Sequence, residues 1–340
     1  RHFLVGGIDR WARIVEDNHH LATDEIARAR IDLAVISVLL DAGAGDAWRY
    51  RETGETGVYT RSEGLAVASV DLFKSGALSD DADQPLRADA QALAKFSATA
   101  LDDAFQVTAD NPLAGSDGRA GLLRALGEGL NSHPELFGSP ARVGNLFDHF
   151  KKIAPDGAIP AQSILGAILS GLESIWPARL ELDGVNLGDV WRHSALHADD
   201  LTDGLAPFHK LAQWLSYSIV EILEDAGMAV TGLDQLTGLP EYRNGGLFVD
   251  LGVLIPRNQK LLREPMAPSS EAIIEWRALT LILLDRIADP VRTELGVDET
   301  QMPLASLLEG GTWAAGRKIA AKLRPGGGPP IQIISDGTVM

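Results

Sequence analysis

The residues best suited to chemistry lie at the two ends of one segment, residues 208–246. The segment opens with Phe208, His209 and Lys210, and Gln213 follows one helical turn later. It closes on a turn rich in proline and glycine that holds Glu241. A lysine and a carboxylate that a fold brings together can perform acid–base chemistry. Ionisable groups on an otherwise apolar helix lose hydration when they are buried, so the pattern favours a site at this place.

Helical spacing gathers the polar members of the first part on one face, and the face consists of Lys210, Gln213, Trp214, Tyr217 and Glu221. A second face, which carries the apolar stripe, consists of Leu211, Leu215, Ile219 and Ile222. An exposed face with a lysine that extends its ammonium into water is the structural alternative. Two large rings beside the lysine make a water-exposed face less favourable, so we interpret the polar face as the wall of a site.

The turn that follows contains the carboxylate. Pro240 suits the first position of a helix, which predicts that Glu241 lies in the first turn. The helix dipole and the free amides there favour the ionised carboxylate. Tyr242 and Arg243 flank it. Residues 244–246, Asn-Gly-Gly, are poor helix formers, so we interpret them as backbone that another group approaches closely.

The whole chain resembles the family of uracil-catabolism proteins of the ring-opening pathway of pyrimidine degradation. The matching motifs are residues 31–35, 40–45, 48–50, 60–65, 110–112, 189–192, 208–210, 239–246, 309–316 and 335–339. Membership implies a pathway in which uracil is ribosylated and phosphorylated, the ring is opened and urea is released.

A more distant resemblance covers residues 208–284. The segment is similar to the queuosine-salvage N-glycosylases, whose fold relates to the helix-hairpin-helix DNA glycosylases. Their motifs match the helix start at Phe208, the run 241–243, Leu251-Gly252, and the Glu-x-Arg pattern that ends at Arg277. The resemblance implies that Lys210 and Glu241 line a site of ribosyl–base cleavage. This chain departs from the pattern with Glu241 in place of an aspartate, and with residues 244–246 in place of a Pro-Gln run.

Together the two resemblances imply an N-glycosidase that cleaves a ribosylurea, or its 5′-phosphate, between ribose C1′ and a urea nitrogen. A carboxylate stabilises the oxocarbenium-like transition state of such a reaction and orients the water, and we expect Glu241 to do so. Lys210 and His209 are both candidates for the general acid. The expected substrate contacts are Gln213, Trp214, Tyr217, Tyr242, Arg243, Trp48, Arg49 and Trp313.

Several of these residues have structural alternatives. Arginine forks match phosphate and flat rings match sugars, but Trp48 and Arg49 equally suit a strand with one buried side. The glycine-containing turn before Trp313 suits an anion, and it also suits the start of a helix.

Two other classes of function stay open. His193 and His197 are four residues apart and two aspartates follow them, which suits a metal-assisted hydrolase acting on the ureido group. A solvated acidic loop is the simpler interpretation, because the third ligand must be assumed. A non-catalytic binding protein of the pathway is the other alternative. The favoured reaction needs no metal or cofactor.

Composition limits the partners and the compartment. The 340 residues carry a net charge of −17 and no clustered basic run, which argues against a nucleic-acid polymer as partner. The chain has no cysteine, which suits a reducing cytoplasm. No apolar stretch is long enough to predict a membrane span. No pattern in the sequence indicates an oligomeric state. We therefore expect a cytoplasmic protein with a small-molecule ribosyl or ribosyl-phosphate substrate.

Periodicity predicts a mainly α fold with small β hairpins, and the resemblance implies a helical core like that of helix-hairpin-helix glycosylases. The expected helices are 23–43, 62–76, 87–104, 118–131, 160–175, 205–226, 270–295 and 312–323. The helix at 270–295 is expected to bury one face, Trp276, Leu279, Leu283 and Ile287. The expected hairpins are 48–59 and 180–187, and residues 330–337 are expected to be extended. One domain over 1–340 is expected, with a weak boundary near 155–160.

Overall fold

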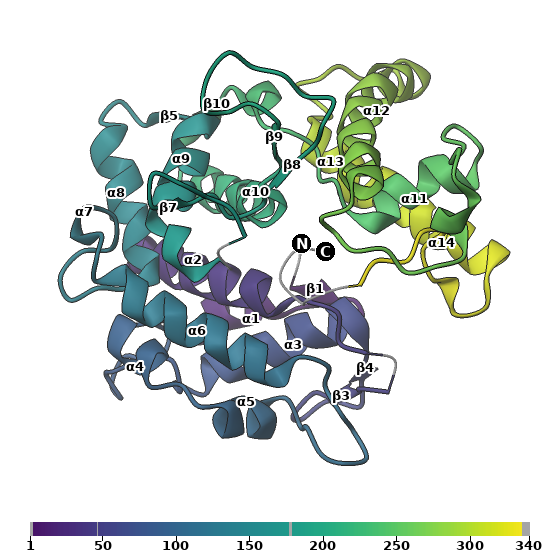
Figure 1. The fold of residues 1–340 in the computed structure, drawn as a ribbon. Coiled ribbons are helices and arrows are strands. Elements are labelled where there is room, and N and C mark those ends of the chain that lie inside the picture. The colour runs from purple at the N-terminus through teal and green to yellow at the C-terminus, as the bar shows by residue number, and fades with distance from the viewer. Residues whose placement is uncertain (1–2, 46, 177–178, 335–340) are drawn as a thin grey trace. The chain divides into compact units, whose positions relative to one another are not determined.

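The computed structural model describes residues 3–45, 47–176 and 179–334. It forms two compact units (Figure 1). The first unit is Arg1–Trp176 together with Leu215–Thr231, and the second is Pro177–Trp214 together with Gly232–Met340. Helix α10, Lys210–Asp225, therefore contributes its start to the second unit and its remainder to the first. The expectation of a single domain stays a prediction.

The first unit is a helical body with short strands. Its elements are β1 Leu4–Val5, β2 Ile8–Asp9, α1 Arg10–Asp17, α2 Thr23–Leu40, β3 Tyr50–Arg51, β4 Val58–Tyr59, α3 Arg61–Lys74, α4 Ala90–Ala94, α5 Ala98–Ala104, α6 Ser116–Leu130, α7 Pro134–Phe137, η1 Val143–Asn145, α8 Leu146–Ile153, β5 Ala158–Pro160, α9 Ala161–Gly171, η2 Glu173–Ile175 and β10 Ala229–Thr231. The two-stranded pairs β1–β2 and β3–β4 are antiparallel, and β5–β10 is parallel.

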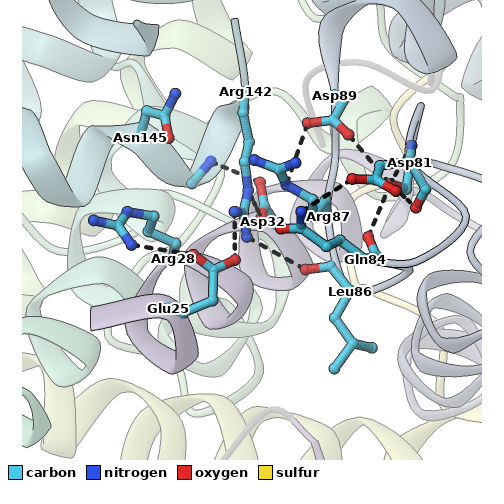
Figure 2. A network of polar contacts seen from close by, with 12 residues as sticks. Glu25, Arg28, Asp32, Asp81, Gln84, Leu86, Arg87, Asp89, Arg142 and Asn145 are labelled. Carbon is cyan, nitrogen blue, oxygen red and sulfur yellow. Dashed lines mark hydrogen bonds and ion pairs between the residues drawn. The ribbon is translucent and has the colours of Figure 1, made fainter. Parts of the chain in front are cut away.

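Helix α2 is the centre of the first unit. Every residue from Ile31 to Leu40 is buried, because the run is apolar on all sides and α3, α6 and α8 pack around it. One carboxylate interrupts the run. Fully buried Asp32 accepts hydrogen bonds from Arg142 Nε at 2.7 Å and from the backbone N–H of Gly144 at 2.6 Å (Figure 2). Burial raises the pKa of Asp32 to about 7, against the charge of Arg142 and the N–H of Gly144.

The second unit pairs a strand ribbon with a helical cluster. Its elements are β6 Glu181–Leu182, β7 Val185–Asn186, β8 Val190–Arg192, β9 Leu205–Pro207, the start of α10, η3 Leu233–Gln235, α11 Tyr242–Asp250, η4 Gln259–Leu262, α12 Glu271–Leu295, α13 Leu304–Leu307, the π-helical turn η5 Leu308–Trp313, α14 Ala314–Leu323 and η6 Pro325–Gly327. Helix α11 packs against α12, α14 and η5 (Figure 1). Pairs β6–β7 and β8–β9 are antiparallel.

The mainly α prediction with small hairpins is confirmed. Both expected hairpins form, and the second turns at Asp183 and Gly184, whose φ angles are 51° and 80°. Of residues 330–334, Ile333 forms an isolated parallel β-bridge with Met266 while 330 and 331 are bends, and 335–337 lie outside the described residues. The glycosylase-like form of the helical core stays a prediction.

Three predicted helices need correction. The single helix expected at 87–104 is two, α4 and α5. The helix expected from 205 begins at Lys210, because 205–207 pair with β8 as strand β9. For α12 the expected core face was Trp276, Leu279, Leu283 and Ile287, and only Trp276 is buried. The buried stripe includes Arg277 and Thr280, two polar positions that the apolar pattern assigns to solvent.

Candidate functional site

The start of α10 is set by the ribbon that precedes it. Strands β8 and β9 pair Val190 with Pro207, which places Asp189 opposite Phe208. The backbone carbonyl of Asp189 accepts the N–H of Phe208 at 3.0 Å. The chain then turns at His209, where φ is +46°, a left-handed conformation that is strained for a residue with a side chain. The helix begins at the next residue, Lys210.

The Asp189 side chain collects the groups around this turn. Its carboxylate accepts both terminal nitrogens of Arg277 at 2.8 Å, the indole N–H of Trp191 at 2.7 Å and the backbone N–H of Lys210 at 3.1 Å. The Arg277 guanidinium, from α12, also lies 4.1 Å from the centre of the Phe208 ring. The Asp189 carboxylate therefore joins α12, strand β8 and the start of α10.

The surroundings at this corner shift the pKa values of both Asp189 and His209. Burial by itself raises the pKa of Asp189, but the hydrogen bonds and charge of Arg277 outweigh it and hold that pKa below its ordinary value. Burial lowers the pKa of His209, where Asp189 acts to raise it and Arg277 to lower it. The His209 imidazole is therefore neutral near pH 7.

Glu241 is the N-cap of α11. Its Oε1 accepts the backbone N–H of Asn244 at 2.6 Å, and its Oε2 accepts that of Arg243 at 2.8 Å. The expectation that Pro240 begins the helix and Glu241 lies in the first turn is therefore wrong by a residue or two. Helix α11 begins at Tyr242, after an extended Glu241 with φ −107° and ψ 162°.

Lys210 and Glu241 both belong to the second unit, and the charge of Lys210 acts on the Glu241 carboxylate. Burial raises the pKa of Glu241, while the N–H groups of Arg243 and Asn244 and the charges of Lys210 and Arg243 act to lower it. Lys210 is only 8% exposed and Gln213 only 6%, so the alternative of a solvated helix face does not hold for them. Gln213 accepts the backbone N–H of Thr237 at 3.4 Å.

Residues 244–246 are helical, contrary to expectation, and the close approach that they allow is made by the protein itself. A Cβ on Gly245 would lie 2.7 Å from Thr280 Oγ1 and 2.9 Å from the Trp276 ring, and one on Gly246 would lie 2.9 Å from Pro330. The buried Asn244 side chain accepts the Thr312 hydroxyl at 2.9 Å and donates to the carbonyl of Leu239 at 3.0 Å. Tertiary packing therefore explains the sequence here.

Other expected contacts of the second unit lie around α10, α11 and η5. Trp214 is half-buried. The Arg243 guanidinium lies 4.8 Å from the Tyr242 ring centre and donates to the carbonyl of Gly327 at 2.7 Å. Trp313 ends the π-helical turn, and Arg317 lies 4.8 Å from its ring centre.

Three expected contacts belong to the first unit. Tyr217 lies on the part of α10 assigned there. Trp48 is fully buried and donates its indole N–H to the carbonyl of Phe105 at 2.9 Å, so the structural alternative accounts for it. Arg49 is exposed and donates to the carbonyl of Trp48 at 2.7 Å. A cavity of about 380 Å³ in this unit is lined by Glu221, a member of the predicted polar face, and by residues that were not predicted, which include Trp11, Arg30 and Asp225.

The two histidines of the metal alternative lie in the loop after β8 and not on a helix. His193 Nδ1 accepts the backbone N–H of Ala195 at 3.1 Å. The side chain of His197 is 82% exposed, and its Nδ1 lies 3.9 Å from Asp203. Within residues 3–45, 47–176 and 179–334, no three histidine or carboxylate side chains are grouped so as to hold a metal ion. Nor does any described helix have the length and apolar composition that a membrane crossing requires.

Sequence reasoning missed Asp189 and Arg277 as members of the site. Both stand inside motifs of the two resemblances, 189–192 and the Glu-x-Arg pattern. The signal that could have found them is a charge of each sign beside buried aromatics, since Asp189 is two residues from Trp191 and Arg277 adjoins Trp276.

Comparison with known proteins places this arrangement in a family. A family model described as "Protein of unknown function (DUF1688)" matches residues 1–340. "Protein urg3" of Schizosaccharomyces pombe is 42% identical over 348 residues, which span 100% of this chain and 82% of that protein. "Uracil catabolism protein 4" of Lachancea kluyveri is 41% identical over 369 residues, which span 100% of this chain and 83% of that protein.

The chain therefore belongs to the DUF1688 family. Its predicted resemblance to the uracil-catabolism proteins is confirmed by these relatives.

Proposed function

We propose that this protein acts in uracil catabolism as an N-glycosidase, which hydrolyses the C1′–N bond of a ribosylurea or its 5′-phosphate and releases urea. A relative named for uracil catabolism supports the pathway. The observation that supports the reaction is that buried Lys210 and the helix-capping Glu241 lie in one unit, where the charge of the lysine acts on the carboxylate.

Glu241 stabilises the developing positive charge at C1′ and orients the water. As the C1′–N bond breaks, its electron pair goes to the urea nitrogen, which takes up a proton, and the water that attacks C1′ loses one. A pKa raised by burial brings the carboxylate closer to the working pH, where a base is most effective. Each carboxylate oxygen has a second lone pair beyond the one that the helix cap uses, so water can still be bound.

We assign the general acid to Lys210. A urea nitrogen is a poor leaving group and needs a proton. His209 is the other candidate, but its lowered pKa leaves it neutral near pH 7. Lys210 acts on Glu241 as a positive charge, and a protonated amine can donate to the departing nitrogen.

The substrate contacts remain part of the proposal. Gln213 and the rings of Trp214 and Tyr242 are proposed to hold the sugar and urea, and Arg243 the 5′-phosphate. Trp313 is a further proposed contact in the same unit, whereas Tyr217, Trp48 and Arg49, which the sequence also suggested, belong to the first unit. The reaction needs no metal or cofactor, and the lack of cysteine suits the cytoplasmic location that we propose.

The test is incubation with synthetic ribosylurea and its 5′-phosphate, with free urea as the readout. We expect urea from the wild-type chain and at least about 100-fold slower release from Glu241→Gln. Asp9→Asn is the matched control, because Asp9 is also a carboxylate N-cap, of α1, where it accepts the N–H of Ala12 at 2.9 Å. Full activity of Glu241→Gln would remove the assignment.

A non-catalytic binding protein is the second candidate. The observation that favours it is the cap itself, since both Glu241 oxygens already accept backbone N–H groups. Calorimetric binding of ribosylurea without release of urea, by a chain whose circular dichroism is native, would select this candidate.

A further inference from the structure

One carboxylate, Asp189, fixes the corner where the chain enters α10. It is not part of the proposed reaction, and neither is Arg277. We propose that Asp189 and Arg277 are a positioning pair that sets the orientation of His209 and Lys210 for catalysis. The inference rests on the proposed function of Lys210, and its first test is independent of turnover.

The backbone at this corner needs such a support. His209 is in the left-handed region, with φ +46°, and its carbonyl accepts the N–H of Gln213 at 2.9 Å, which makes it the first hydrogen-bonded residue of the helix. Strained conformations persist only where the surroundings determine them. Asp189 holds the backbone on both sides of His209. Its backbone carbonyl accepts the N–H of Phe208, and its carboxylate accepts the N–H of Lys210.

Arg277 differs from a guanidinium that only holds the fold. Asp250 and Arg324 form the comparison, also a two-bond pair in the second unit, at 2.7 and 2.6 Å. There the Nε of Arg324 donates to the carbonyl of Gly328 at 2.8 Å, so the guanidinium is satisfied. Arg277 is 1% exposed, and its Nε has no hydrogen-bond partner. An unpaired buried donor calls for an explanation, and placement over Phe208 beside His209 provides one.

The pair also controls the charge at His209, and in opposite directions. The charges that act on this imidazole come from Asp189, just before β8, and from Arg277, on α12. Loss of the carboxylate leaves the guanidinium unopposed, so the pKa of His209 should fall further. Loss of the guanidinium leaves the carboxylate, so that pKa should rise. A general loss of structure would not give opposite signs.

The experiment is a titration followed by NMR of the full chain with isotope-labelled histidine. The His209 resonance is assigned with the variant His209→Gln, in which that one signal is missing. We expect Asp189→Asn to lower the His209 midpoint and Arg277→Gln to raise it. Asp250→Asn, the matched control, should leave it unchanged. Shifts of the same sign, no shift, or an equal shift in the control would overturn the proposal.

A second variant separates position from charge. Arg277→Lys keeps the charge but loses the two-bond geometry. We expect it to leave the His209 midpoint near that of wild type, while kcat for urea release falls about tenfold or more and KM changes less than about threefold. Unchanged kcat with urea still produced would overturn the positioning role. Absence of urea from the wild-type chain, with the opposite NMR shifts present, would instead refute the proposed function.

Discussion

Gly245 is a residue at which the packing of α11 against α12 is sensitive to one methyl group. Gly245→Ala would place a Cβ 2.9 Å from two atoms of the Trp276 ring and 2.7 Å from Thr280 Oγ1. Neither neighbour moves easily, because the indole is 5% exposed and the Thr280 hydroxyl is bonded to the carbonyl of Trp276 at 2.7 Å. The helices must therefore separate.

The magnitude follows from opposing effects. Alanine gains about 1 kcal/mol over glycine in a helix interior. Overpacking costs about 1–3 kcal/mol. Separation also weakens the hydrogen bond from Trp276 Nε1 to the Gly245 carbonyl, 3.2 Å long, which is worth about 1 kcal/mol. We expect Gly245→Ala to lower the free energy of unfolding by about 1–3 kcal/mol.

Guanidinium unfolding followed by circular dichroism measures this, with Gly166→Ala as the control. Gly166 is inside α9, and a Cβ there meets nothing within 4 Å, so that variant should gain about 1 kcal/mol. The reasoning is refuted if Gly245→Ala is as stable as wild type, or if both variants change stability in the same direction. Displacement of α11 also moves its cap, so urea release should fall in Gly245→Ala and not in the control.

The remaining predictions concern charge. Glu241→Gln should lose urea release by at least about 100-fold and about 0.5–2 kcal/mol of stability, measured by urea assay and unfolding, because a charged cap becomes neutral. The acid limb of the kcat/KM pH profile should lie above 4.5, since burial raises the pKa of Glu241. Asp32 has a folded pKa above its ordinary 3.8, so its stabilising contribution is present below pH 3.8 and is lost as pH rises toward about 7. The unfolding free energy of wild type minus that of Asp32→Asn should therefore fall over that range; a constant difference would contradict it.

Sequence patterns predicted the elements whose signals are local. Helix α2 and the hairpin at Asp183 and Gly184 need only an apolar run and a turn dipeptide. Helix α11 lacked such a signal, because its two central glycines disfavour a helix in isolation and are required by contact with α12 and Pro330. The core face of α12 was misassigned for a related reason: Arg277 is buried only because Asp189, far away in sequence, pairs with it.

The sequence suggested which residues could form a site, but it did not indicate the hydrogen bonds that hold them in place. Lys210 and Glu241 were chosen from spacing and resemblance, and they stay a prediction; the structure adds that the charge of Lys210 acts on Glu241. The left-handed turn at His209 could not be predicted, since nothing in its residue type requires it. It depends on hydrogen bonds to Asp189, which a one-dimensional pattern does not contain.

The catalytic role that we propose for Glu241 need not compete with its structural role as a helix cap. A cap bond orients each oxygen and holds the carboxylate at one position, as the proposed reaction requires of a group that meets a transient charge. The backbone N–H groups lower the carboxylate's pKa and burial raises it, so the cap keeps ionisation possible in a place where burial alone would oppose it. A glutamate held only by water would lack both the fixed geometry and this balance. The cap therefore fixes the orientation of the Glu241 carboxylate and opposes the rise in its pKa that burial causes.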